Sequence, residues 1–203
     1  MPDRIAPTHG VVVLAAGSSS RLGTNKLLLQ HDDEAFARRA VRLALATAPG
    51  DAVVVLGAEG DRVFGELAGL CVRRVDCANW AEGMGASLQT GLNALAENCD
   101  AALVVVCDQP ELQAAHLQAL CTAWRATPQK AVASRYMERL GVPAVLPRAW
   151  FAGIQARGDQ GARGLFVDRP SEVVAIANDS LGIDIDTPVD LEAFERARPR
   201  RRS

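Results

Sequence analysis

Short apolar runs, rich in Val and Ala, recur along the chain, and within each run apolar and polar positions do not alternate. Strands that are buried on both faces, as in a parallel sheet covered by helices, have this pattern. It predicts strong strands at residues 11–16, 52–56 and 101–107, and weaker ones at 71–75 and 131–134.

The segments between these runs carry apolar residues at helical spacing. They predict helices at residues 34–48, 61–70, 85–97 and 111–125. Strands that alternate with helices in this way predict an α/β fold, in which helices flank a mostly parallel, doubly wound sheet.

The second half of the chain is less regular. Gly and Pro interrupt residues 140–147, and residues 158–164 have the composition of a loop that leads into a short helix. Residues 182–185 form a candidate last strand. Thr187 and Pro188 are then typical of a helix start, with Thr as the N-cap and Pro at the first helical position.

The chain has 203 residues, of which 49% are hydrophobic and 23% charged, and its formal net charge is −2. This composition excludes a wholly disordered chain, and the length suits one domain with a full core. A net charge so close to zero gives no global attraction to nucleic acid or to an anionic membrane, so we expect neither as a partner. We expect a flexible N-terminus at 1–9, the domain at 10–197 and a basic disordered tail at 198–203.

The cysteines and histidines form no pattern typical of a metal site. The five cysteines contain no C-x-x-C pair, and His9, His31 and His116 lie far apart in the sequence. The first ten residues are too polar and too short for a signal peptide, and no run of 18 apolar residues is present. We therefore expect a reduced, cytoplasmic protein.

Residues 14–26, after the first predicted strand, combine a turn of small residues with two cations. Gly17 and residues 18–20 allow backbone N–H groups to face an anion. Arg21 offers a fork of donors to a phosphate, and Lys26, one of only two lysines, offers a compact mobile charge. Neither the dinucleotide fingerprint G-x-G-x-x-G nor the P-loop pattern is present. We predict a phosphate-binding loop; the alternative is an ordinary surface loop.

Carboxylates follow two of the predicted strands. Asp108 comes directly after the strand at 101–107, where open α/β sheets place their ligands, and its oxygens suit Mg²⁺. Its alternative role is that of a turn residue between strand and helix. Asp184 and Asp186 are two apart in an extended segment, so both can face one cation. Asp186 has the alternative role of capping the following helix.

Two glycine-containing segments are further candidates for ligand binding. In residues 79–88, glycines allow close backbone approach, and Ser87 offers a donor and an acceptor for a pyrimidine edge. Trp80 is more typical of packing than of stacking on a base, and Ser87 has the alternative role of a helix cap. In residues 158–163, Arg163 follows two glycines and suits a second phosphate; its alternative is an arginine at the start of a helix.

The pattern L-A-[AG]-G-x-S-x-R-[ML]-G-x-x-K in residues 14–26 resembles the opening motif of nucleotidyltransferases with a Rossmann-like, glycosyltransferase-A type fold. Its Ala-Ala-Gly form is similar to that of molybdenum cofactor cytidylyltransferases, whereas the related guanylyltransferases typically have Ala-Gly-Gly. The resemblance extends from residue 11 to about residue 194. It includes W-x-E-G-x-x-x-S-L at 80–88, D-x-P at 108–110, G-D-x-G-A-R at 158–163 and T-P-x-[DE]-L at 187–191.

The resemblance implies a transfer of CMP from CTP to the terminal phosphate of a molybdopterin-type cofactor, with release of pyrophosphate. It implies Mg²⁺ or Mn²⁺ as the cofactor and a recipient molybdoenzyme as a further partner. The implied catalytic residues are Arg21, Lys26 and Asp108, and the implied metal ligands are Asp108, Asp184 and Asp186. The implied nucleotide-binding residues are Leu14, Ala15, Ala16, Gly17, Ser18, Ser19, Arg21, Lys26, Glu82, Gly83 and Ser87. The implied acceptor-binding residues are Gly141, Pro143, Asp159, Gly161 and Arg163.

One departure from the family pattern concerns the acceptor. The family usually has Tyr-x-Gly before G-x-P, whereas this chain has Tyr136, Met137 and Glu138 before Gly141 and Pro143. The acceptor is therefore less well defined than the nucleotide.

Three other functions remain open from the sequence. The same chemistry can use GTP or a different phosphate-bearing acceptor. A nicotinamide-dependent oxidoreductase is disfavoured because the glycine fingerprint is missing. A non-catalytic chaperone for a molybdoenzyme is disfavoured because the chain keeps the Arg21–Lys26 pair and three carboxylates.

Overall fold

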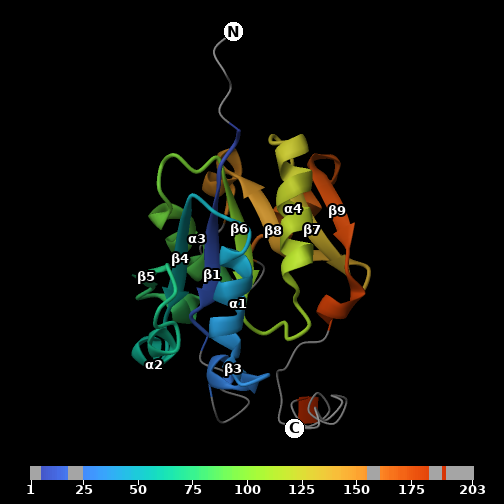
Figure 1. The fold of residues 1–203 in the computed structure, drawn as a ribbon. Helices are drawn as coiled ribbons and strands as arrows, with labels where there is room; N and C mark the ends of the chain where they lie inside the picture. Colours follow the sequence, from blue (N-terminus) through green and yellow to red (C-terminus); the bar gives the residue numbers. More distant parts are fainter. Residues whose placement is uncertain (1–5, 18–24, 155–160, 183–188, 191–203) are drawn as a thin grey trace.

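The computed structural model describes residues 6–17, 25–154, 161–182 and 189–190 (Figure 1). In these residues seven strands form one sheet with the order β5-β4-β1-β6-β8-β7-β9, and β2 and β3 form a separate hairpin. The strands are β1 (His9–Ala15), β2 (Gln30–His31), β3 (Glu34–Ala35), β4 (Asp51–Leu56), β5 (Arg73–Asp76), β6 (Ala101–Val106), β7 (Ala131–Tyr136), β8 (Arg139–Pro147) and β9 (Val173–Ala177).

Helices cover both faces of this sheet. The α-helices are α1 (Phe36–Leu45), α2 (Gly60–Gly65), α3 (Met84–Ala94), α4 (Ala114–Ala126) and α5 (Arg163–Asp168). The 3₁₀ helices are η1 (Lys26–Leu28), η2 (Trp80–Glu82), η3 (Arg148–Gly153), η4 (Pro170–Glu172) and η5 (Asp179–Gly182). The predicted α/β class, with a mostly parallel sheet flanked by helices, is confirmed.

The strand directions create one edge at which nearly all strands end. β1 pairs in parallel with β4 and β6, β4 with β5, and β7 with β9, whereas β8 runs antiparallel to both β6 and β7. We call the edge where β1, β4, β5, β6, β7 and β9 end the carboxyl edge, and the opposite one the amino edge. Ligands of open α/β sheets bind at the carboxyl edge.

The core has two layers, one on each face of the sheet. α1 and α4 pack on one face, and α3, α5 and η3 pack on the other. Every residue of β1 and β6 is buried, which explains why their apolar runs do not alternate. Each fully buried Val contributes about 1.5–3 kcal/mol to stability. α3 lies so close to the sheet that a Cβ at Gly91 would be 2.4 Å from Val12 Cγ1.

Two predicted helices are shorter than expected. Residues 34 and 35 belong to β3, not to α1, because Asp32 and Asp33 adopt positive φ angles of 51° and 63° and turn the chain into the β2–β3 hairpin. The helix predicted at 61–70 ends at Gly65. Arg38 Nη1 satisfies the carbonyls beyond this end, at 2.8 Å from Glu66 O and 2.9 Å from Ala68 O.

The sequence patterns missed β8 and β9. Residues 140–147 were expected to be irregular, yet β8 is a nine-residue strand inside the sheet. Met137 and Glu138 make the two-residue turn before it, with φ angles of 48° and 58°, as a type I′ hairpin requires. Pro143 lies where the β7–β8 register shifts, so no ladder bond to its missing N–H is needed. The peptide bond between Val142 and Pro143 is cis.

The chain after β9 is described only in part. Gly182, the first residue of the predicted last strand, belongs to η5, and the rest of that strand lies outside the described residues. Thr187 and Pro188 also lie outside them, whereas Val189 and Asp190 are helical. No helix in the described part of the chain is long and apolar enough to cross a membrane.

Candidate functional site

The central feature of the carboxyl edge is an ion pair between two of the predicted site residues. Lys26 Nζ lies 2.8 Å from Asp108 Oδ2, and the two side chains are 16% and 28% exposed. Lys26 begins η1 and Asp108 follows β6, so 82 positions of sequence separate them. The structure thus brings together the cation predicted for phosphates and the carboxylate predicted for a metal.

The backbone of Lys26 is held by its neighbours. Asn25 is 3% exposed, and its Oδ1 accepts a hydrogen bond of 3.1 Å from Leu27 N, as an N-cap does. Leu27 is buried in the core layer between the sheet and the helices α1 and α4. Only the long side chain of Lys26 therefore reaches across to Asp108. Asn25 Nδ2 is buried and has no hydrogen-bond partner among the described residues.

Asp108 is placed by the buried end of β6. Cys107, directly before it, is buried, and its Sγ donates to Leu14 O at 3.6 Å, which joins the ends of β6 and β1. Burial, and to a lesser degree the charge of Asp108, raises the pKa of the Cys107 thiol. A neutral, buried thiol of this kind is a poor nucleophile.

Gln109 links the end of β6 to the strand that carries the predicted acceptor residues. Its Nε2 donates to Val142 O at 3.0 Å, and Tyr136 Oη donates to the same carbonyl at 3.1 Å. The next carbonyl, Pro143 O, accepts a bond of 2.6 Å from Ser134 Oγ. These bonds fix Val142 and Pro143 beside the end of β6. Sequence reasoning gave Gln109 no role, because an amide between Asp and Pro has no local pattern.

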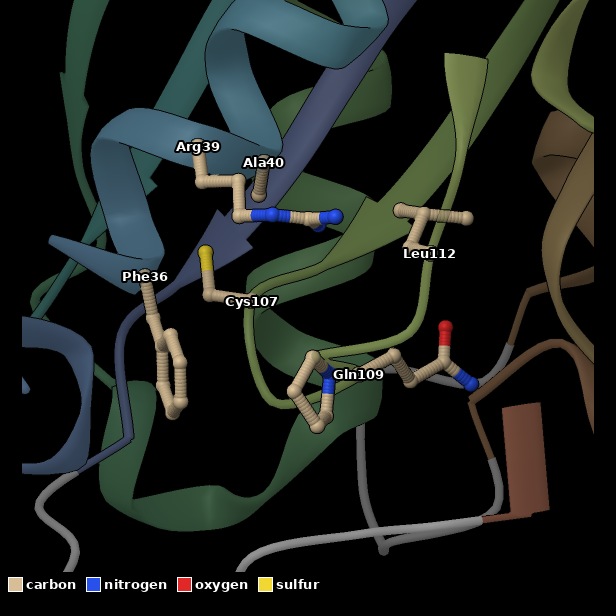
Figure 2. A pocket seen from close by; sticks show the side chains of 7 residues that line it. Phe36, Arg39, Ala40, Cys107, Gln109 and Leu112 are labelled. Carbon is tan, nitrogen blue, oxygen red and sulfur yellow. The ribbon is translucent and has the colours of Figure 1, made fainter. Parts of the chain in front are cut away.

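A narrow pocket lies between α1 and the segment after β6 (Figure 2). Arg39 from α1 and Gln109 and Leu112 from the β6–α4 segment line it. Gln109 Oε1 is buried and has no hydrogen-bond partner in the described chain. The pocket holds about 180 Å³ of empty space, less than the roughly 300–1,000 Å³ of a typical ligand pocket, so it does not suit a substrate.

The start of α3 carries the second predicted nucleotide segment. Gly83, with a φ of 114°, ends η2 and is the N-cap of α3. Ser87 lies one turn further along the helix, so the alternative role of a cap is wrong. Ser87 is 5% exposed, and its Oγ lies 4.0 Å from Cys77 Sγ at the end of β5. The base contact predicted for Ser87 stays a prediction.

The predicted acceptor loop meets the start of α3. Gly161 has a φ of +50°, and a Cβ there would lie 3.1 Å from Met84 Sδ. Arg163, the first residue of α5, is exposed. At Gly141, a Cβ would lie 2.6 Å from Tyr136 Oη, so this position needs glycine for a close packing contact. The two halves of the predicted site are therefore neighbours in the fold.

Several predicted residues lie outside the described part of the chain: Ser18, Ser19, Arg21, Asp159, Asp184 and Asp186. Their roles stay predictions. The described residues contain no group of three or more His, Cys, Asp or Glu side chains that could hold a metal ion. Asp108 itself suits a cation, because the ammonium group of Lys26 already occupies a cation position against its carboxylate.

Residues 11–173 match the family model described as the MobA-like NTP transferase domain. The chain belongs to this family. Two curated relatives span nearly the same length. Nicotine blue oxidoreductase of Paenarthrobacter nicotinovorans is 30% identical and is aligned over 92% of this chain and 96% of its own. Purine catabolism protein PucB of Bacillus subtilis is 28% identical, and the match covers 92% of this chain and 95% of that protein.

Two solved structures of another protein have the same architecture. Rv0371c of Mycobacterium tuberculosis superimposes with a TM-score of 0.81 at 26% identity, and the match covers 95% of this chain and 100% of that one. A structure of Rv0371c in complex with manganese gives a TM-score of 0.71 at 25% identity, over 94% and 100% of the two chains. Membership of the family supports NTP transfer as the chemistry of the domain.

Proposed function

We propose that this MobA-like protein transfers CMP from CTP to the terminal phosphate of a molybdopterin-type acceptor and releases pyrophosphate. The main support is the Lys26–Asp108 contact at the carboxyl edge, because it joins a phosphate-binding cation to a carboxylate suited to a metal. The family supports the nucleotidyl transfer. CTP as the nucleotide rests on the Ala15-Ala16-Gly17 form of the first loop.

The chemistry joins two anions, so the site must neutralise charge and align the reactants. An oxygen of the acceptor phosphate attacks the α-phosphorus of CTP, and the bond from that phosphorus to the bridging oxygen of pyrophosphate breaks. Lys26 and Arg21 hold the triphosphate and offset the charge that develops on the leaving group. Alignment alone can supply up to about 7–11 kcal/mol of the barrier. No nucleophilic side chain is required.

Asp108, together with Asp184 and Asp186, would hold a divalent cation, Mg²⁺ or Mn²⁺. A bound cation of this kind neutralises phosphate charge and acts as a Lewis acid. The manganese complex of Rv0371c supports this choice of cofactor by similarity.

The acceptor side is supported by the neighbours of the β7–β8 hairpin. Gly141 and Pro143 lie beside the end of β6, Gly161 lies beside Met84 at the start of α3, and Arg163 follows as the first residue of α5. Glu138, the residue that departs from the family pattern, occupies an exposed hairpin turn with a φ of 58°, where the glycine of the family is favoured for its backbone. We therefore assign Glu138 to the turn and keep the molybdopterin-type acceptor.

The test is pyrophosphate release by the purified protein with Mg²⁺ and molybdopterin, with CTP and GTP compared at equal concentration. We expect release with CTP and much less with GTP. A preference for GTP would replace the nucleotide while leaving the transfer chemistry intact. CTP binding in a thermal-shift assay without pyrophosphate release would favour the non-catalytic chaperone.

A second candidate function is an oxidoreductase, because one full-length relative is named nicotine blue oxidoreductase. The test of this candidate is the oxidation of NADH by the wild-type protein, with a redox-active dye as the electron acceptor. The loss of NADH absorbance measures the reaction. We expect no NADH turnover. Dye-dependent oxidation of NADH would support the oxidoreductase instead.

A further inference from the structure

In the ion pair at the carboxyl edge, a lysine proposed to bind phosphates and a carboxylate proposed to bind a metal contact each other. Asp108 Oδ2 is the oxygen that Lys26 Nζ contacts at 2.8 Å. A cation such as Mg²⁺ binds a carboxylate oxygen at about 2.0–2.1 Å. An ammonium group on the same oxygen would then lie beside the metal, and the two positive charges would repel each other. Lys26 and a metal therefore compete for Asp108.

We propose that Lys26 prevents divalent cations from binding to Asp108 until a nucleotide binds. Without nucleotide, Lys26 neutralises Asp108 and weakens its affinity for a metal. When a triphosphate enters the site, Lys26 turns to the phosphates and frees the carboxylate. This inference rests on the proposed function, and it makes Lys26 the residue that couples metal binding to nucleotide binding.

The local structure allows the required movement. Asn25 and Leu27 hold the backbone of Lys26, so the movement is confined to its flexible four-carbon stem. The Lys26 side chain is 16% exposed, so it lies near the surface and not in the closed core. Asp108, in contrast, lies two residues after the end of β6, and every residue of β6 is buried. An exchange of cations at the carboxylate therefore needs only rotations of the lysine stem.

The test measures binding of Mn²⁺ alone, without nucleotide, by the loss of the free Mn²⁺ signal in electron paramagnetic resonance. The variants are Lys26→Met, Lys26→Gln and Asp108→Asn. Lys130→Met is a matched control: it removes the same charge from the other lysine, which contacts Ser171 O at 3.1 Å near the start of β9. Thermal unfolding shows which variants are folded, and Lys26→Gln replaces Lys26→Met if the latter does not fold.

We expect Lys26→Met to bind Mn²⁺ about tenfold more tightly than the wild type, because the metal no longer competes with the ammonium group for the Asp108 carboxylate. Lys130→Met should bind like the wild type, and Asp108→Asn should lose the site. Equal dissociation constants for the wild type and Lys26→Met, with the site lost in Asp108→Asn, would overturn this inference and leave Asp108 as a metal ligand. If Asp108→Asn binds Mn²⁺ like the wild type, the proposed metal role of Asp108 fails, and this inference fails with it.

A second readout uses the presence of only two lysines in the chain. Protein labelled with ¹³C at the ε-carbon of lysine gives two signals, from Lys26 and Lys130, and Lys130→Met assigns them. Addition of CTP without metal should shift the Lys26 signal and leave that of Lys130 unchanged. A Lys26 signal that does not respond to saturating CTP would contradict the movement.

Discussion

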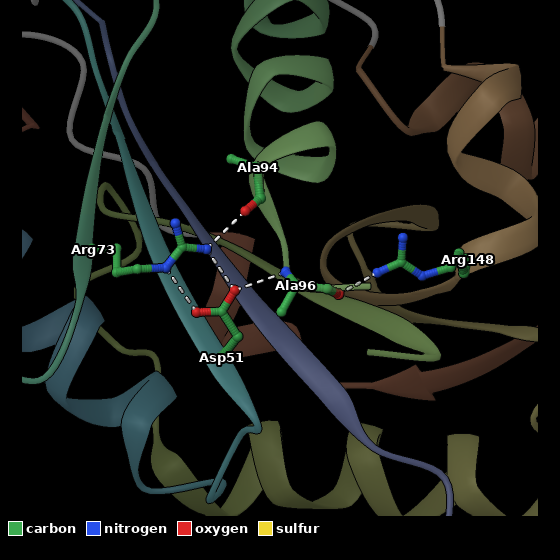
Figure 3. A network of polar contacts seen from close by, with 5 residues as sticks. All are labelled: Asp51, Arg73, Ala94, Ala96 and Arg148. Atoms are coloured by element: carbon green, nitrogen blue, oxygen red, sulfur yellow. Dashed lines mark hydrogen bonds and ion pairs between the residues drawn. The ribbon is translucent and has the colours of Figure 1, made fainter. Parts of the chain in front are cut away.

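The two edges of the central sheet are held by different kinds of contact. At the amino edge, Asp51 of β4 and Arg73 of β5 form a two-pronged ion pair, with 3.1 Å from Nε to Oδ1 and 2.6 Å from Nη2 to Oδ2 (Figure 3). Asp51 Oδ2 also accepts from Ala96 N at 2.9 Å, and Arg73 donates to Ala94 O at 2.7 Å. These bonds join two strands to the end of α3.

The amino-edge network continues beyond these strands. Arg148, directly after β8, donates to Ala96 O and to Cys99 O, each at 2.5 Å. Thr8 N donates to Asp100 Oδ2 at 2.9 Å. The charged side chains of this edge therefore pair with fixed partners, most of them backbone groups, and they hold the sheet, α3 and η3 in one unit.

The carboxyl edge also has side-chain bonds to the backbone, from Gln109 and Tyr136 to Val142 O, but its central ion pair is of another kind. The Lys26–Asp108 pair joins two partly exposed side chains, and that of Lys26 has a long flexible stem. Asn25 Nδ2 and Gln109 Oε1 are buried there without a partner among the described residues. Buried polar groups are normally satisfied, and an exception calls for an explanation such as a catalytic role or a bound water or ion. The comparison indicates that the amino edge provides stability and the carboxyl edge provides chemistry.

The largest expected effect separates activity from stability at the carboxyl edge. Lys26→Met should lower turnover about 10²–10³-fold, the usual cost of removing one group that stabilises the transition state. Its free energy of unfolding should change little, because the ion pair is partly exposed. Pyrophosphate release and urea unfolding measure the two quantities, with Lys130→Met as the control. An unchanged rate of pyrophosphate release would remove Lys26 from the site.

The next effect concerns pH and the amino edge. His9, at the start of β1, is buried; its Nε2 lies 2.9 Å from Thr47 Oγ1 and its Nδ1 lies 3.3 Å from Arg125 Nη2. Thr47 Oγ1 donates its hydrogen to Ala44 O, so His9 Nε2 must donate to Thr47 Oγ1. The other ring nitrogen, Nδ1, then accepts from Arg125. This arrangement requires a neutral ring. Burial, helped by the charge of Arg125, lowers the pKa of His9 to about 4.

The pKa of His9 in the unfolded chain is near 6.5, so the unfolded state takes up the proton first as the pH falls. Stability should therefore be complete above about pH 6.5 and decline by up to about 3 kcal/mol as the pH falls to about 4. Burial also lowers the pKa of His116, which adds a decline of the same sign. Urea unfolding of the wild type and of His9→Gln across this range measures the effect, and equal slopes for the two proteins would contradict it.

A smaller loss is expected when the amino-edge ion pair is broken. Asp51→Ala removes the carboxylate that holds Arg73 and leaves Ala96 N without its acceptor, so we expect a loss of about 2 kcal/mol in the free energy of unfolding. Turnover per folded molecule should be unchanged. Asp61→Ala is the matched control, because Asp61 pairs with Arg74 but is 91% exposed, and exposed pairs contribute about 0–1 kcal/mol. If the two variants lose the same free energy of unfolding, the amino-edge network contributes no more to stability than an exposed ion pair.

The smallest effect is expected at the end of β7, beside the strand that we assign to the acceptor. Tyr136→Phe removes one of the two donors to Val142 O and leaves that of Gln109. We expect a loss of about 0.5–1.5 kcal/mol in stability. The KM for the acceptor should rise, because Val142 and Pro143 are less firmly held, while CTP binding stays the same. A change in CTP affinity alone would contradict the assignment of β8 to the acceptor side.

The parts of the fold that could be predicted are those whose signal is local. The β1, β4 and β6 runs are buried on both faces, so their lack of alternation identified them as parallel strands. β8 could not be found in this way, because Gly141 and Pro143 are typical of loops and only the partners Ser134, Tyr136 and Gln109 make them part of a strand. Those partners are distant in sequence.

The same distinction holds for the site. Lys26 and Asp108 were identified by their places after β1 and β6, because the ends of neighbouring parallel strands meet at one edge. Their direct contact of 2.8 Å could not be predicted, since it depends on how η1 follows the first loop. The link from Gln109 to Val142 and the buried position of Ser87 likewise depend on tertiary packing.

The most direct test of the proposed nucleotidyl transfer is mass-spectrometric detection of the product after incubation with CTP, Mg²⁺ and molybdopterin. The wild-type protein should form a molybdopterin joined to CMP by a diphosphate link, with one pyrophosphate released for each product molecule, and Lys26→Met should form about 1% or less of it. Absence of this product with folded wild-type protein and intact molybdopterin, or equal formation by Lys26→Met, would contradict the proposal.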